Sequence, residues 1–200
     1  MKQIDIDFFW KILKKKSYYN DYRYSQKLNQ SYYENFFENN LNKIPIILSS
    51  DTWMKGYKDR LSGWRDAHTE NNIDYNDSYI VKPESNLENG GYIEARKLLK
   101  KSKKIDAIFC TSDEIAMGTY QALKEEGLTI PKDISIIGFD NSKLSLLVKP
   151  KLTTVQLPYS EMTQKAIQHI IDPQKFDDNF SILVDSHLIK RGSVKVKNEN

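Results

Sequence analysis

The sequence predicts an α/β fold: a mainly parallel sheet flanked by helices on both faces. The first observation is a pair of short apolar runs, at 105–110 and 134–139, of the kind that strands show when both faces are buried. The second is the amphipathic helical spacing between them. The third is that strands and helices alternate from Ile44 onward, which favours a parallel sheet covered by helices.

Each element follows from a local pattern of apolar and polar residues. The expected strands cover 44–48, 79–82, 105–110, 134–139 and 152–157, with a further strand region at 180–190. The expected helices cover 54–71, 89–101 and 159–171, with a further helix that starts at 111–114. Residues 172–179 are expected to form a polar turn. A faint helical face also runs through 29–41.

The helix between the two apolar runs carries signals at both ends. Thr111 and Glu114, three residues apart, predict a capping box, in which their side chains satisfy two helix N–H groups. Gly127 stands where a helix end needs a positive φ, and Pro131 follows it. The segment is therefore expected to form a βαβ unit.

Polar residues follow both strands of this unit. Ser112 and Asp113 come after the first, and Asp140 and Asn141 come after the second. In open α/β sheets, ligands bind just beyond the carboxyl ends of the strands. The pattern thus predicts that Asp113 and Asp140 border a site.

Bulk properties exclude several classes of protein. A hydrophobic content of 39% over 200 residues suits one domain, or one domain with a tail. The single cysteine, Cys110, excludes an internal disulfide and fits a reducing compartment. The N-terminus has acids before its apolar residues and lysines after them, the reverse of a secretory signal, and no run is long enough to span a bilayer. We expect a cytoplasmic protein with no membrane partner.

The first 43 residues differ from the rest. They hold eight Lys/Arg against five Asp/Glu, and 11 of the 23 aromatic residues. This predicts three parts: a basic, aromatic-rich segment at 1–43, a lobe at 44–193 and a tail at 194–200. Lysines beside aromatic rings could bind single-stranded nucleic acid. Because aromatics at helical spacing usually form core, we favour a packed role.

Other chemistry has little support. His68, His169 and His187 are far apart and lack metal-ligand spacing to Cys110, which sits in an apolar strand typical of core. The sequence has no G-x-S-x-G elbow, no phosphate-binding loop and no dinucleotide fingerprint. We expect no catalytic residue, no metal and no cofactor, and hence no enzyme.

Six motifs in order resemble the lac-repressor (LacI) family of bacterial transcription regulators, in its periplasmic-binding-protein-like sugar-binding domain. Each motif is weak alone, but their order along residues 44–193 makes the resemblance specific. They are R-L-S-G-W at 60–64, G-Y at 91–92, A-I-F-C-T-S-D-E-I-A-M-G at 107–118, I-P-K-D-I-S-I-I-G-F-D at 130–140, L-T-T-V at 152–155 and L-I-K-R-G-S at 188–193.

The resemblance implies a ligand role for Arg60, whose planar fork of donors suits vicinal hydroxyls or a carboxylate. The alternative is a solvated helix arginine. Asp140 could accept hydrogen bonds from a sugar, or could cap the next helical turn. Asp113 is ambiguous, because Asp in a first helical turn is stabilising in any case. Ser112 stands where the family has Asn, and its hydroxyl has a shorter reach.

Two further departures concern the ligand pocket. Asn86 replaces the aromatic residue on which family ligands stack, and Leu157 replaces a Gln. Together with an incomplete pocket wall, these changes predict sugar affinities in the millimolar range or no binding.

The resemblance implies that the chain holds the second lobe and the crossing segments, without the helix-turn-helix and nearly all of the first lobe. We therefore expect a truncated, non-catalytic effector-binding domain with a sugar or sugar-like ligand. DNA would be contacted only through a helix-turn-helix outside this sequence. Alternatives are a solute-binding protein, which the missing signal disfavours, or an interaction module.

Self-association is a further expectation. In the family, segments matching the one around Met117 and the one at 146–148 lie at a subunit interface. This predicts a homodimer with an apolar surface made by Ile115, Met117, Tyr120, Leu144, Leu146, Leu147 and Val148. The helix at 159–171 matches one that packs on the first lobe in the family.

Overall fold

The structure is a computed structural model. It describes residues 18–19, 22–23, 43–50, 55–84, 88–102, 104–172, 184 and 186–195. The expected helical face at 29–41, most of the expected polar turn at 172–179 and residues 180–183 lie outside these ranges. The boundary near Lys43 and the tail at 194–200 stay predictions.

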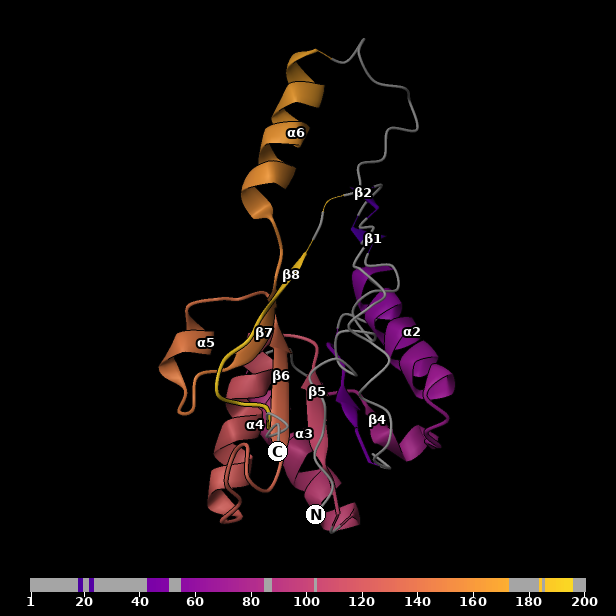
Figure 1. Ribbon diagram of the computed structural model, residues 1–200, viewed down its shortest axis with the longest axis vertical. Coiled ribbons are helices and arrows are strands. Elements are labelled where there is room, and N and C mark those ends of the chain that lie inside the picture. Colours follow the sequence, from indigo (N-terminus) through magenta and orange to yellow (C-terminus); the bar gives the residue numbers. More distant parts are fainter. Residues whose placement is uncertain are drawn as a thin grey trace, which may run out of the picture.

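A six-stranded sheet forms the centre of the molecule (Figure 1). Its order is β4 (Ile80–Val81), β3 (Ile46–Ile47), β5 (Ala107–Cys110), β6 (Ser135–Phe139), β7 (Thr153–Gln156) and β8 (His187–Ile189). All neighbours pair in parallel except β7 and β8, which are antiparallel. The predicted fold class, a mainly parallel sheet, is confirmed.

Helices cover both faces of this sheet. The helices are α2 (Lys55–Glu70), the short η2 (Asp77–Tyr79), α3 (Glu88–Lys101), α4 (Asp113–Glu125), α5 (Leu144–Leu147) and α6 (Tyr159–Ile171). Figure 1 shows α2 on one side of the sheet, and α3 and α4 on the other. A separate antiparallel pair, β1 (Tyr18–Tyr19) and β2 (Tyr22–Arg23), has β1 in contact with α2.

Successive side chains along each strand point to opposite faces of the sheet, and this divides the core into two layers. Ile46, Phe109 and Ile137 point to the layer that contains Trp64 of α2. The neighbouring strand residues point to the layer shared with α3 and α4; these are Ile47, Ile108, Cys110 and Ile136. Because both faces are buried, the strands are nearly all apolar, which explains why they were visible in the sequence.

The start of α4 differs from the prediction. The cap is Ser112, whose Oγ accepts from the backbone N–H of Ile115 at 3.2 Å, so the expected capping box of Thr111 and Glu114 is wrong. The Thr111 hydroxyl instead donates to the carbonyl of Ile47 at 3.1 Å, and this bond ties the end of β5 to β3. Gly127 does have the expected positive φ, at 71°.

Two glycines let α3 and α4 pack closely. A Cβ on Gly118 would lie 1.8 Å from the carbonyl oxygen of Glu88, and one on Gly91 would lie 2.1 Å from that of Ile115. Only a residue without a side chain fits at such a contact. The A-M-G and G-Y motifs are therefore two sides of one helix contact.

The expected apolar dimer surface is partly wrong. Ile115 and Tyr120 are core residues, 0% and 7% exposed, because α4 turns them toward α3 and the sheet. Leu146 and Leu147 of α5 remain exposed, at 49% and 67%. The exposed apolar surface on this side is therefore smaller than the sequence suggested.

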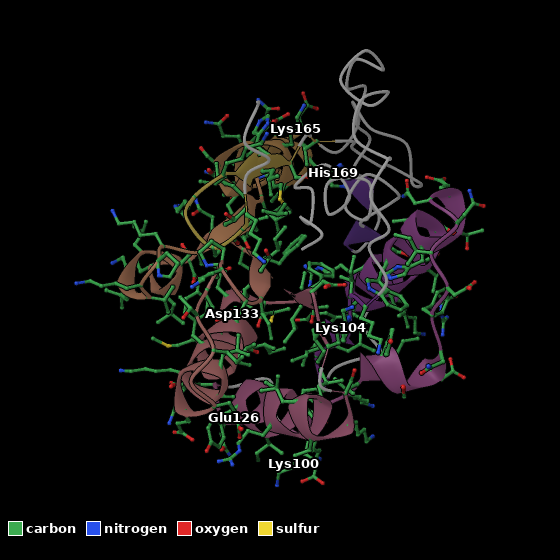
Figure 2. All side chains as sticks on the ribbon, turned by 60° about the horizontal axis from the view of Figure 1, so that its bottom comes forward. Lys100, Lys104, Glu126, Asp133, Lys165 and His169 are labelled. Atoms are coloured by element: carbon green, nitrogen blue, oxygen red, sulfur yellow. The ribbon has the colours of Figure 1, made fainter. Side chains whose placement is uncertain are left out.

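Helix α6 extends beyond the sheet and stands apart from it (Figure 1). It has no buried residue, and Ile170 and Ile171 are 74% and 77% exposed. Figure 2 shows its Lys165 and His169 on the side away from Lys100 and Glu126, which lie at the ends of α3 and α4. The carboxyl ends of the parallel strands face the α6 side. Among the described helices, none combines the length and the hydropathy needed to cross a membrane.

Candidate functional site

The candidate site lies where the winding direction of the sheet changes. The chain runs from β3 to β4 on one side and then returns to β5 on the other side of β3. Loops that leave β3 and β5 therefore diverge, and ligands of open α/β sheets bind at such a point, outside the carboxyl ends of the strands. Ser49 follows β3, Thr111 follows β5 and Asp140 follows β6.

Arg60 reaches this edge of the sheet from α2. It is 7% exposed, and its Nη1 donates to the carbonyl of Thr111 at 3.2 Å. Its guanidinium carbon lies 3.7 Å from the centre of the Phe139 ring and 4.7 Å from that of Tyr57. Such contacts attract a cation to the ring faces and fix the plane of the guanidinium.

The Arg60 guanidinium keeps unused donor capacity. An arginine offers five N–H donors, and its bond to Thr111 uses one of them. The Nε of Arg60 is buried and has no hydrogen-bond partner among the residues that the structure describes. A buried polar atom without a partner costs free energy, about 1–3 kcal/mol, unless a ligand or water satisfies it. This N–H group is suited to a ligand hydroxyl.

Asp140 lies at the same edge of the sheet and has an unusual backbone conformation. Its φ is +108° and that of Asn141 is +50°, so two successive residues have the positive φ values that side chains other than glycine rarely adopt. Such positions cost about 1–3 kcal/mol each and persist only where the surroundings hold them. Burial raises the pKa of Asp140 to about 6, while the positive charge of Arg60 opposes this rise. The Tyr159 hydroxyl lies 3.5 Å from Asp140 Oδ1.

Asp113 is committed to internal bonds. It is 2% exposed, and it accepts from the Thr154 hydroxyl at 2.6 Å and from the backbone N–H of Ser142 at 2.7 Å. Burial raises the pKa of Asp113, and these hydrogen bonds oppose the rise. A Cβ on Gly138 would lie 2.4 Å from Asp113 Oδ1, so the glycine of the I-I-G-F-D motif makes room for this carboxylate.

The four described residues predicted for the site meet at one sheet edge. Arg60 and Asp113 both act electrostatically on Asp140, and Ser112 precedes Asp113. Ser112 is 6% exposed, and its hydroxyl oxygen caps α4, which leaves the hydroxyl hydrogen for donation. The fifth predicted residue, Asn86, lies outside the described residues.

The remaining features of the described chain offer no competing chemistry at this edge. No group of three or more His, Cys, Asp or Glu in the described ranges could hold a metal ion. Burial raises the pKa of Cys110 to about 12, so its thiol stays protonated near neutral pH. A polar pocket of about 220 Å³ lies at the opposite sheet edge, lined in part by Lys43, Ser78 and Lys101.

Comparison with known proteins decides the family. Residues 33–194 match the model of the periplasmic binding protein-like domain. The chain belongs to this family, in the form found in LacI-type regulators. The resemblance predicted from the six motifs is confirmed.

Relatives of this LacI-type domain are transcription regulators. The HTH-type transcriptional regulator MalR of Clostridium butyricum is 38% identical over 135 residues, which cover 67% of this chain and 40% of MalR. The ribose operon repressor of Haemophilus influenzae is 36% identical over 128 residues, or 64% of this chain and 38% of that protein. The chain thus spans about 40% of the length of these relatives.

A solved structure agrees with the fold. The sugar-binding transcriptional regulator of the LacI family from Escherichia coli, complexed with phosphate, superposes with a TM-score of 0.68 at 27% identity. The match covers 76% of this chain and 55% of that one.

Several residues at this edge of the LacI-type lobe were not predicted from the sequence. Phe139 and Tyr57 flank Arg60, and Arg191 supports the loop after β6. Leu157, expected as a pocket position, is 6% exposed and lies in the core. Its neighbour Gln156 is exposed and accepts from the Asn141 amide at 3.3 Å. The polar Gln156 between the apolar Val155 and Leu157 was a usable sequence signal for this difference.

Proposed function

We propose that this chain is the effector-binding part of a LacI-type regulator, and that it binds a small polyhydroxylated ligand without catalysis. The observation that carries the proposal is the buried Arg60 guanidinium, which lies over the Phe139 and Tyr57 rings, has no partner for its Nε–H among the described residues and acts electrostatically on Asp140. A fixed donor next to an acceptor suits adjacent hydroxyls of a sugar.

The names of the relatives support a sugar as the ligand class. One relative is named a ribose operon repressor and another a sugar-binding regulator. Since both are regulators, we also propose a cytoplasmic location and a regulatory rather than enzymatic role. DNA contact would require a helix-turn-helix, which is not expected in this chain.

Ligand-observed saturation-transfer NMR tests the proposal. The probes are D-ribose, D-glucose, D-galactose and maltose, each at up to 20 mM with the 200-residue chain. We expect binding in the millimolar range, because the described polar contacts come from a single sheet edge. Arg60→Met removes charged hydrogen bonds of about 1.5–3 kcal/mol, which amounts to a roughly 10–100-fold loss of affinity.

Arg65→Met is the matched control, because Arg65 lies on the same helix and is exposed. The proposal holds if a sugar signal disappears in Arg60→Met and survives in Arg65→Met. A signal that Arg60→Met leaves unchanged places the site elsewhere. Absence of any signal in the wild type rejects sugars of this class.

A second proposal concerns association between copies of the chain. Leu146 and Leu147 on α5 are exposed apolar side chains on a helix of four residues. Exposed apolar clusters mark interaction surfaces more often than isolated residues do. We therefore propose a homodimer that uses α5, and its test is given in the Discussion.

A further inference from the structure

The loop after β6 holds an unfavourable backbone conformation that needs an explanation. Asp140 and Asn141 have φ values of +108° and +50° in succession. Asn visits the left-handed region several times more readily than most residues, but a φ of +108° is unusual for Asp. Side chains from other parts of the chain must therefore hold this pair.

Arg191 reaches this loop from the other end of the chain and bonds the side chain of Asn141. It lies just after β8, 50 residues along the chain from Asn141. Its Nη2 donates to Asn141 Oδ1 at 2.6 Å, and its Nη1 donates to Ser145 Oγ at 2.9 Å and to the carbonyl of Leu152 at 2.8 Å. The guanidinium therefore joins the loop after β6 to the start of β7.

A second set of bonds fixes the other side of the loop. The N–H of Ser142 donates to Asp113, and the N–H of Asn141 donates to the Thr154 hydroxyl at 3.3 Å. The N–H of Asp140 donates to the carbonyl of Val155 at 2.9 Å. None of these bonds uses the Asp140 carboxylate, which is left to face Arg60 and Tyr159.

We infer that Arg191 is a positioning residue: by holding Asn141, it fixes the left-handed turn that presents the Asp140 carboxylate to the ligand. The inference rests on the proposed function, because it assigns Asp140 to that same site. The inference goes beyond the proposed function because it makes ligand affinity depend on Arg191, which follows β8 and lies outside the site. The planar fork is essential, since one guanidinium must reach Asn141, Ser145 and Leu152 together.

The experiment compares variants of two well-bonded arginines. Arg191→Met removes the fork, and Arg191→Lys keeps the charge but offers a single ammonium. Arg96→Met is the matched control: Arg96 bonds Tyr92 at 2.9 Å and pairs with Glu125 and Glu126, in the α3–α4 contact. Each variant is measured for thermal stability, for affinity toward the sugars above, and for the pKa of Asp140 by carbon-detected NMR titration.

We expect both Arg191 variants to weaken sugar binding at least fivefold, and Arg96→Met to leave it within twofold at a similar loss of stability. The pKa of Asp140 should fall from about 6 toward the ordinary value of 3.8 in the Arg191 variants only, because a released loop exposes the carboxylate. Asn141→Gly keeps the backbone freedom and removes the acceptor, so adding it to Arg191→Met should cause no further loss of affinity.

The pKa measurement separates this inference from the proposed function. If no sugar binds the wild type but the pKa of Asp140 falls in the Arg191 variants alone, positioning by Arg191 is correct and the sugar assignment is wrong. If that pKa stays near its wild-type value in both Arg191 variants, Arg191 contributes only to stability and the inference is overturned. Rescue of affinity by Arg191→Lys would also overturn it.

Discussion

His68 should make the stability of this domain fall between pH 8 and pH 5. The ring is 0% exposed, its Nδ1 lies 2.8 Å from the carbonyl oxygen of Trp64, and its centre lies 4.0 Å from that of the Trp64 ring and 5.2 Å from that of Tyr75. Burial lowers the pKa of His68 from 6.5 to about 4, although the bond to Trp64 opposes this.

The sign follows from where the proton binds. Between pH 6.5 and 4 the unfolded chain holds a proton at this histidine and the folded chain does not. The contribution of His68 to the free energy of unfolding is therefore fully present above pH 6.5 and is lost as the pH falls toward 4. With 1.36 kcal/mol for each pH unit of difference, the loss from pH 8 to pH 5 is about 2 kcal/mol.

Urea unfolding at pH 8, 7, 6 and 5 measures this loss. His68→Phe keeps a ring at the site and removes the titration, so its stability should fall by about 2 kcal/mol less than that of the wild type over this range. His187→Gln, which removes an exposed histidine, should follow the wild type. Asp140, whose pKa is raised to about 6, increases the free energy of unfolding as the pH falls. This effect is the same in all three proteins, because Asp140 is present in each. Parallel curves for wild type and His68→Phe would refute the reasoning.

Two further predictions concern helix packing and association. Gly118→Ala should destabilise the fold by about 1–3 kcal/mol, because its Cβ would lie 1.8 Å from the Glu88 carbonyl oxygen. Gln121→Ala, at an exposed position of the same helix, should have little effect on the midpoint of urea unfolding. Equal midpoints for the two variants would contradict this prediction. Sedimentation velocity at tens of micromolar should show a dimer, and Leu147→Glu should give a monomer; a wild-type monomer would argue against an interface at α5.

The elements that depend on local pattern could be predicted from the sequence. The bounds of α6 agree with the expected 159–171, and β6 differs from the expected strand by a single residue. The helix has apolar residues at helical spacing, and the strand is a short, almost wholly apolar run, so each pattern indicates its element clearly. The polar residues after β5 and β6 were also found, because a parallel sheet collects its strand ends at one edge.

Features that depend on distant contacts could not be predicted. Thr111 is a good capping residue, but the carbonyl of Ile47, 64 residues away, takes its hydroxyl, and Ser112 becomes the cap. Arg191 reads as an ordinary polar residue, since its partner Asn141 lies 50 residues earlier. Nor does the sequence show that Asp113 is enclosed, which requires Gly138 beside it.

Backbone amide NMR during a sugar titration tests the central claim most directly. The described part of the chain places polar residues at opposite sheet edges: Arg60 and Asp140 at one edge, and the pocket near Ser78 and Lys101 at the other. If the carboxyl edge is the effector site, added sugar shifts the amides of Ser112, Asp140 and its loop, and Arg60→Met abolishes these shifts. Shifts confined to Ser78, Lys101 and their neighbours would contradict the account.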